Sequence, residues 1–197
     1  MGEIVRKYRP IKLIGVIFTC IAVLLVIISV AASDWVDVTF RSGNREHNTW
    51  GLWEQCYSSP TNPTLTVCVH NDWMAACAAL TLIALFACIG AVGLGILGLF
   101  THNRMWYVIA GVLCTFAAVG LLICSIIYPV KFSEDIQSLE NGKLILRWDV
   151  DWTYGVGLGG MFFMVASAVF FFLKQEEQDL DTYSSAAPAY NVNSSYT

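Results

Sequence analysis

The residues best suited to chemistry in this sequence are its seven cysteines and three histidines. Cys56 and Cys68 lie in a polar stretch between two long apolar segments. We expect a structural disulfide between them, worth ~3 kcal/mol in chain entropy, since the topology below places both on the oxidising side. A redox-active pair is the alternative, but the chain has no Cys-x-x-Cys. We expect the other five to be small buried hydrophobes: Cys20, Cys77, Cys88, Cys114 and Cys124.

The histidines and acidic residues do not indicate an enzyme. His47, His70 and His102 are far apart in sequence, so we expect solvated loop histidines, with no catalytic, cofactor or metal site and no small-molecule substrate. The first polar loop carries acidic residues that could attract cations: Asp34, Asp37, Glu46, Glu54 and Asp72. Arg41 and Arg45 are interleaved with them, which favours an ordinary solvated surface.

Four apolar segments predict an integral membrane protein. The chain is 56% hydrophobic and only 13% charged, about half the usual share of charge. The charge-free segments are 13–32, 74–100, 106–127 and 153–173. Each is long enough to cross the ~30 Å hydrocarbon core. The third is expected to end at Tyr128-Pro129, because proline disrupts helices. A cleaved signal peptide is the alternative for the first segment. The lack of charge within the segments argues against a transporter.

The basic residues predict the orientation. Arg6, Lys7, Arg9 and Lys12 precede the first span, which places the N-terminus in the cytoplasm, and four crossings return the C-terminus there. The predicted cytoplasmic parts are 1–12, 101–105 and 174–197, and the predicted extracellular loops are 33–73 and 128–152.

Both extracellular loops have strand character. Period-two alternation, β-branched and aromatic residues and flanking turn residues indicate strands at 35–40, 49–53, 65–69 and 143–148. Pro60, Asn62 and Pro63 are expected to break the chain between the second and third. Isolated hairpins are marginal in water, so we expect one sheet.

Small residues recur at helix-packing intervals in two spans. Ala87, Ala91 and Gly95 are four apart, as are Gly155 and Gly159. Such faces let helices approach closely in lipid. Packing within one bundle is favoured over oligomerisation, because every four-helix bundle must pack.

The composition of the tail, 174–197, predicts disorder, since its acidic and Ser/Ala/Tyr/Asn-rich sequence cannot bury enough apolar surface. We also expect no N-glycan. Asn193-Ser194-Ser195 falls in the cytoplasm, and Asn62-Pro63-Thr64 is blocked by its proline. The net charge of -4, with no basic stripe, argues against nucleic-acid binding.

The first loop carries an ordered set of residues that points to a family. Trp35, then Gly51-Leu52-Trp53, then Cys56 and Cys68 resemble the W–GLW–C–C signature of the claudin and peripheral myelin protein superfamily. The resemblance covers residues 10–175. Within it, 128–132, 152–155 and 9–13 are similar to the branch of PERP and transmembrane protein 47, also called brain cell membrane protein.

The resemblance implies a fold and a role. The fold is a membrane all-α, left-handed four-helix bundle with a small extracellular antiparallel sheet, four strands from the first loop and one from the second. The role is a non-enzymatic plasma-membrane protein of cell–cell junctions, with functions in adhesion and epithelial integrity. Its expected partners are membrane lipids, junctional or adhesion proteins, cytoskeletal adaptors and further copies of itself. The signature residues would hold the shape of the sheet.

Two alternatives from other classes stay open. One is a paracellular barrier or channel former that polymerises into strands, and the other is an auxiliary subunit of an ion channel. Because the chain ends in Thr197 rather than in a Tyr-Val type carboxylate, binding of the tail to PDZ domains is not expected.

Overall fold

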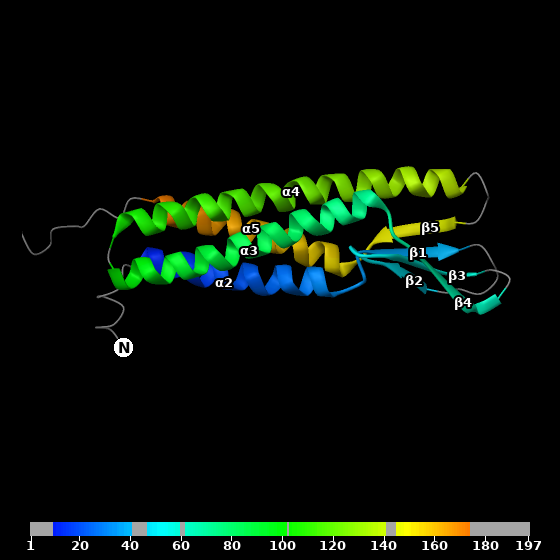
Figure 1. Ribbon diagram of the computed structural model, residues 1–197, viewed down its shortest axis with the longest axis horizontal. Helices are drawn as coiled ribbons and strands as arrows, with labels where there is room; N and C mark the ends of the chain where they lie inside the picture. The colour runs from blue at the N-terminus through cyan, green and yellow to red at the C-terminus, as the bar shows by residue number, and fades with distance from the viewer. Residues whose placement is uncertain (1–9, 41–46, 60–61, 102, 141–144, 174–197) are drawn as a thin grey trace, which may run out of the picture.

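The computed structural model describes residues 10–40, 47–59, 62–101, 103–140 and 145–173. The N-terminal arginines, His102 and the tail from 174 lie outside the described residues, so the predictions about them stay predictions. Within the described part, the chain forms four helices side by side and one sheet at one end of them (Figure 1).

The helices confirm the four predicted spans. They are α2 (Pro10–Ala31), α3 (Asp72–Thr101), α4 (Arg104–Glu140) and α5 (Trp152–Phe172). Each of these is long and apolar enough to cross a membrane. Around the bundle, α2 packs on α3, α3 on α4, α4 on α5, and α5 on α2.

Helix α4 contradicts the predicted end of the third span. It continues through Pro129 to Glu140, so residues 128–140 are helix rather than loop. The continuation buries the side chains of Tyr128 and Phe132 against the sheet end of the molecule. Burying one large apolar side chain stabilises by roughly 1.5–3 kcal/mol, which offsets the hydrogen bond that Pro129 cannot make.

The sheet has the strand order β4-β3-β2-β1-β5, and the pairings among these strands are antiparallel. Four strands come from the first loop and one from the second, as the resemblance implied. They are β1 (Val36–Phe40), β2 (His47–Trp50), β3 (Gln55–Ser59), β4 (Asn62–Val69) and β5 (Ile145–Val150). Val36 lies opposite Trp50 on one side and Val150 on the other, so the second loop completes the sheet.

Three details of the strand predictions were wrong. The strand predicted to run through Trp53 ends at Trp50, and the next residues turn instead, with the Gly51 N–H donating to the Glu54 carbonyl at 3.2 Å. Strand β3 was not predicted. Pro63, expected as a breaker, lies near the start of β4, the edge strand, where a missing ladder hydrogen bond costs least.

The close helix contacts differ in part from the predicted small-residue faces. Ala91 and Gly95 are buried as expected, and a Cβ on Gly95 would lie 2.9 Å from Val16 Cγ2. In α5 the tight approaches are at Gly157 and Gly160 instead, where a Cβ would lie 2.7 Å from Ser29 Oγ and 2.9 Å from Val26 Cγ2. A Cβ on Gly155 would meet nothing within 4 Å, and one on Gly159 only Leu25 Cδ1 at 3.8 Å. The four-residue spacing therefore selected two glycines of α5 that do not lie at its contact with α2.

The cysteine prediction holds for four of the five residues. Cys77, Cys88, Cys114 and Cys124 are buried in the bundle. Cys20 is exposed, because it lies on the outward side of α2. An exposed apolar side chain on a membrane helix contacts lipid, so this position has no need of burial.

We predict that Gly160→Val destabilises the bundle, whereas Gly155→Val does not. The added side chain at 160 collides with Val26 and forces overpacking worth about 1–3 kcal/mol. The apparent melting temperature of the purified chain in detergent measures the difference. Equal melting temperatures for the two variants would contradict the assignment of the packing face.

Candidate functional site

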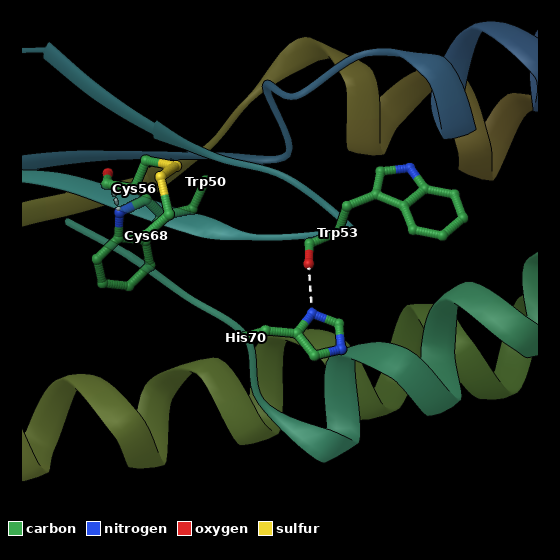
Figure 2. Close-up of a disulfide and its surroundings, with 5 residues drawn as sticks. All are labelled: Trp50, Trp53, Cys56, Cys68 and His70. Atoms are coloured by element: carbon green, nitrogen blue, oxygen red, sulfur yellow. Dashed lines mark hydrogen bonds between the residues drawn. A yellow bond between two sulfur atoms is a disulfide. The ribbon is translucent and has the colours of Figure 1, made fainter. Parts of the chain in front are cut away.

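The disulfide that the sequence predicted links the two strands at one edge of the sheet. Cys56 on β3 and Cys68 on β4 lie directly opposite each other, with their Cα atoms 4.1 Å apart and their sulfur atoms bonded (Figure 2). The Trp50 indole donates to the Cys56 carbonyl at 3.0 Å and so ties β2 to the same point. The disulfide thus joins β4 to β3, and the Trp50 bond joins β3 to β2.

Trp35 joins the sheet to the end of α2. Its indole N–H donates to the Ser29 carbonyl at 2.8 Å, and its side chain is only 3% exposed. Ser29 belongs to the last turn of α2, whose carbonyls have no partner within the helix. The Trp35 carbonyl accepts from the Asp151 N–H at 3.0 Å, next to the start of α5. One tryptophan therefore links two helix ends to the sheet.

Trp53 makes the matching contact one residue further along α2. Its indole N–H donates to the Val30 carbonyl at 2.9 Å, while 43% of its side chain stays exposed. The Trp53 carbonyl lies 2.7 Å from His70 Nδ1, so that His70 holds the same turn (Figure 2). His70 is exposed in a loop, as expected, and it also bonds to the backbone.

Gly51 and Leu52, which come directly before Trp53 in the chain, are both buried. A Cβ on Gly51 would lie 2.9 Å from the Ser33 Cα, so a side chain there would collide with backbone. The Gly51 carbonyl accepts from the Tyr128 hydroxyl at 2.9 Å, and Leu52 is fully buried. We call Trp35, Gly51, Leu52, Trp53 and Tyr128 the sheet joint, because together they seat the sheet on the bundle.

The part of α4 after Pro129 also packs against the sheet end of the molecule. Phe132 has ring contacts with Trp50 at 5.2 Å and with Trp148 at 5.4 Å between centroids. The Asp135 carboxylate accepts from the Trp73 indole and from the Asn71 amide, both at 3.1 Å. Sequence reasoning placed this segment in a loop and missed these residues. The helical spacing of Tyr128, Phe132 and Asp135 past the proline was the available signal.

Comparison with known proteins agrees with this architecture. Residues 9–173 match the model of the PMP-22/EMP/MP20/Claudin family. The chain belongs to this family. It is also 30% identical over 152 residues to p53 apoptosis effector related to PMP-22 from Danio rerio, a match that covers 76% of each chain. This claudin-family chain is thus a multi-pass membrane protein, and the recognition of the family from the W–GLW–C–C residues is confirmed.

At the opposite end of the bundle, this claudin-family chain uses Lys12 in a way the sequence did not reveal. The Lys12 side chain is buried, at 5% exposure, and its ammonium donates to the carbonyls of Phe170, Phe171 and Leu173 at 3.0, 2.8 and 2.7 Å. It also lies 5.5 Å from the centre of the Tyr107 ring. Lys12 thus caps the C-terminus of α5, where a cation is favoured by the helix dipole.

The described residues with metal-ligating atoms close together are Glu54, Cys56 and Cys68. Both sulfur atoms are already bonded to each other, so neither is a thiolate that could bind a metal. Among the acidic residues predicted to form a surface, Asp37 lies opposite Asp149 of β5 in the sheet. The side chain of Glu46 lies outside the described residues.

We predict that Cys56→Ser, Cys68→Ser and the double variant lower the free energy of unfolding by the same amount, about 3 kcal/mol. The two sulfurs form one bond that closes a loop of sequence separation 12, so losing either partner loses the whole constraint. Thermal unfolding in detergent measures the effect. Additive losses in the double variant would mean that the two cysteines stabilise the fold separately.

We predict that Lys12→Met destabilises the bundle by about 2 kcal/mol, because it leaves buried carbonyls at the end of α5 without their charged donor. The matched control is Lys131→Met, since Lys131 is exposed and pairs only across one helical turn with Glu134 at 2.7 Å. An exposed pair of this kind contributes little. The apparent melting temperatures of the two variants in detergent measure the difference. A fall for Lys12→Met alone supports the capping of α5, whereas no fall for Lys12→Met would contradict it.

Proposed function

We propose that this chain is a non-enzymatic tetraspan protein of the plasma membrane that organises cell–cell contacts and supports epithelial integrity. The observation that carries the proposal is the five-stranded sheet, which stands on one end of the bundle and combines residues of both loops. Membership of the PMP-22/EMP/MP20/Claudin family and the likeness to p53 apoptosis effector related to PMP-22 support it.

The proposed orientation places the sheet outside the cell and both termini in the cytoplasm. Arg6, Lys7, Arg9 and Lys12 precede the apolar part of α2, and basic residues favour the cytoplasmic side. The disulfide lies at the opposite end of the bundle from the start of α2, and disulfides persist in oxidising compartments. The two observations use different physics and support the same orientation.

The sheet joint suits a surface that contacts other proteins. Trp35 and Trp53 bind the last carbonyls of α2, Tyr128 binds Gly51, and Asp135 binds the start of α3. These contacts hold the sheet in one position before any partner arrives. Preorganisation of this kind lowers the entropy lost on binding. The proposed role of the signature residues is therefore to hold the shape of the sheet.

The described side chains support a role without catalysis. The cysteines of the sheet form a disulfide, and His70 bonds to a backbone carbonyl. The acidic residues of α3 and α4 whose side chains are described, Asp72, Glu134 and Asp135, lie in the parts of these helices next to the sheet. The proposed partners are membrane lipids, junctional or adhesion proteins, cytoskeletal adaptors and further copies of the chain.

We predict that the chain, expressed with a C-terminal fluorescent tag in cells that lack junctions, concentrates at borders between two expressing cells. A C-terminal epitope should be stained only after permeabilisation. Imaging against adherens, desmosomal and tight-junction markers in epithelial cells identifies the junction. The matched control is the Cys56→Ser/Cys68→Ser double variant, which loses the disulfide of the sheet but keeps the sequence of all four helices.

Three results would contradict parts of this proposal. Uniform distribution over the membrane would exclude a role at cell–cell contacts. Staining of the C-terminal epitope on intact cells, or a glycosidase-sensitive mass shift, would reverse the orientation. Continuous intramembrane strands in freeze-fracture would support the strand-forming barrier or channel instead, and co-purification with a pore-forming subunit would support the auxiliary-subunit alternative.

A further inference from the structure

Two of the buried cysteines face each other across the contact between α3 and α4. The Cys124 sulfur on α4 lies 3.8 Å from the Cys77 carbonyl oxygen and 3.5 Å from the Thr81 hydroxyl oxygen, both on α3. The thiols of Cys77 and Cys124 also hydrogen-bond to each other. Each of the two cysteines is only 1% exposed, so their contact is closed to both water and lipid.

The backbones of α3 and α4 approach closely at this level of the bundle. A Cβ on Gly120, one turn before Cys124, would lie 3.8 Å from the Ala84 Cβ and 3.9 Å from the Leu80 carbonyl oxygen. A disulfide requires Cα atoms within about 7 Å of each other. Small residues on both helices thus allow the close approach that such a bond requires.

The pair of thiols lies at the end of the bundle that carries the sheet. Cys77 is in the second turn of α3, which begins at Asp72. Cys124 is one turn before Tyr128, whose hydroxyl binds the sheet joint. The disulfide of the adjacent sheet indicates that this end faces an oxidising compartment. Two thiols in direct contact at this end are therefore placed where a disulfide can persist.

The other two buried cysteines have different contacts. The Cys88 thiol donates to the Thr19 carbonyl at 3.9 Å, and the Cys114 sulfur lies 4.0 Å from the Thr19 hydroxyl oxygen. Both residues are fully buried. Each of these thiols therefore interacts with α2, whereas those of Cys77 and Cys124 interact with each other. Cys88 and Cys114 are thus an internal control, on the same two helices.

We propose that Cys77 and Cys124 form a second disulfide when the chain meets a small uncharged oxidant of the hydrogen peroxide class, and that this bond cross-links α3 to α4. One sulfur attacks a peroxide oxygen, the O–O bond breaks, and a sulfenic acid and one water form. The second sulfur attacks the first, the S–O bond breaks, and the hydroxyl group leaves with the thiol proton as a second water. The two thiols supply the two electrons that reduce the peroxide.

Burial determines how this pair reacts. A small neutral oxidant can enter when side chains move, and the sulfenic acid that it forms already has a thiol in contact with it. Reduction by thiol exchange requires a thiolate to reach a disulfide sulfur, so a buried cross-link resists it. The inference goes beyond the proposed function, because it concerns the chemistry of the bundle and holds for any role of the sheet.

The test is disulfide mapping of the full chain in lipid nanodiscs, with and without hydrogen peroxide. Remaining thiols are alkylated in denaturant, and peptides are analysed by mass spectrometry without reduction. We expect peroxide to produce a linked peptide pair containing Cys77 and Cys124 and to lower alkylation at both by more than half. Alkylation of Cys88 and Cys114 should not change. A Cys77–Cys124 link already present before peroxide would support the proposal equally.

Two mapping results would overturn the proposal. One is alkylation of Cys77 and Cys124 that peroxide leaves unchanged when no link is present beforehand. The other is sulfinic acid at either residue without the linked peptides. The mapping uses the unsubstituted chain, so it decides the question even where a variant fails to fold.

The matched variants are Cys77→Ala and Cys88→Ala, each of which removes one buried thiol from α3. Peroxide should raise the apparent melting temperature of the unsubstituted chain and of Cys88→Ala by roughly 5–10 °C, because a cross-link constrains the unfolded chain. It should leave Cys77→Ala unchanged. An equal rise in Cys77→Ala would overturn the proposal. Failure of the adhesion experiments would leave these results unaffected.

Discussion

The fold depends on one constraint, which is that a backbone carbonyl at the end or at a break of a membrane helix must find a donor in the protein. Where such a carbonyl is shielded from water, leaving it unpaired costs several kcal/mol. The indoles of Trp35 and Trp53 serve the end of α2, and the ammonium of Lys12 serves the end of α5. The hydroxyl of Tyr154 serves the Ser125 carbonyl in α4, which Pro129 leaves without its helix donor.

This constraint explains why the sheet is attached as it is. The donors for the last carbonyls of α2 are Trp35 and Trp53, which lie next to the strands. The same hydrogen bonds therefore complete the end of α2 and attach the sheet to it. Gly51 allows the two to come together, because any side chain would collide with Ser33. The disulfide then extends this fixed position to β3 and β4. The sheet is thus held rigid by its hydrogen bonds to helix termini as well as by the pairing of its own strands.

Much of this could be predicted from the sequence, because the strongest signals are local. Long apolar segments indicated the four helices. The position of Cys56 and Cys68 in one predicted extracellular loop indicated the disulfide between them. The failures come from tertiary contacts that no local pattern reveals. Pro129 carries a strong local penalty, but burial of Phe132 and the Tyr154 bond outweigh it. Gly155 and Gly159 matched a spacing rule, although the neighbouring helix α2 passes close to Gly157 and Gly160 instead.

The residues that hold the sheet in place differ from those that are exposed on it. Trp35 and Leu52 are buried in the joint, and Gly51 admits no side chain, so a change at any of them alters the fold first. Under the proposed function, contacts with a partner are left to positions whose side chains reach solvent, such as Trp148 on β5 and Asp149 beside it. A substitution at these exposed positions should therefore leave the fold intact, because the carbonyl constraint acts on the sheet joint and not on the exposed face of the sheet.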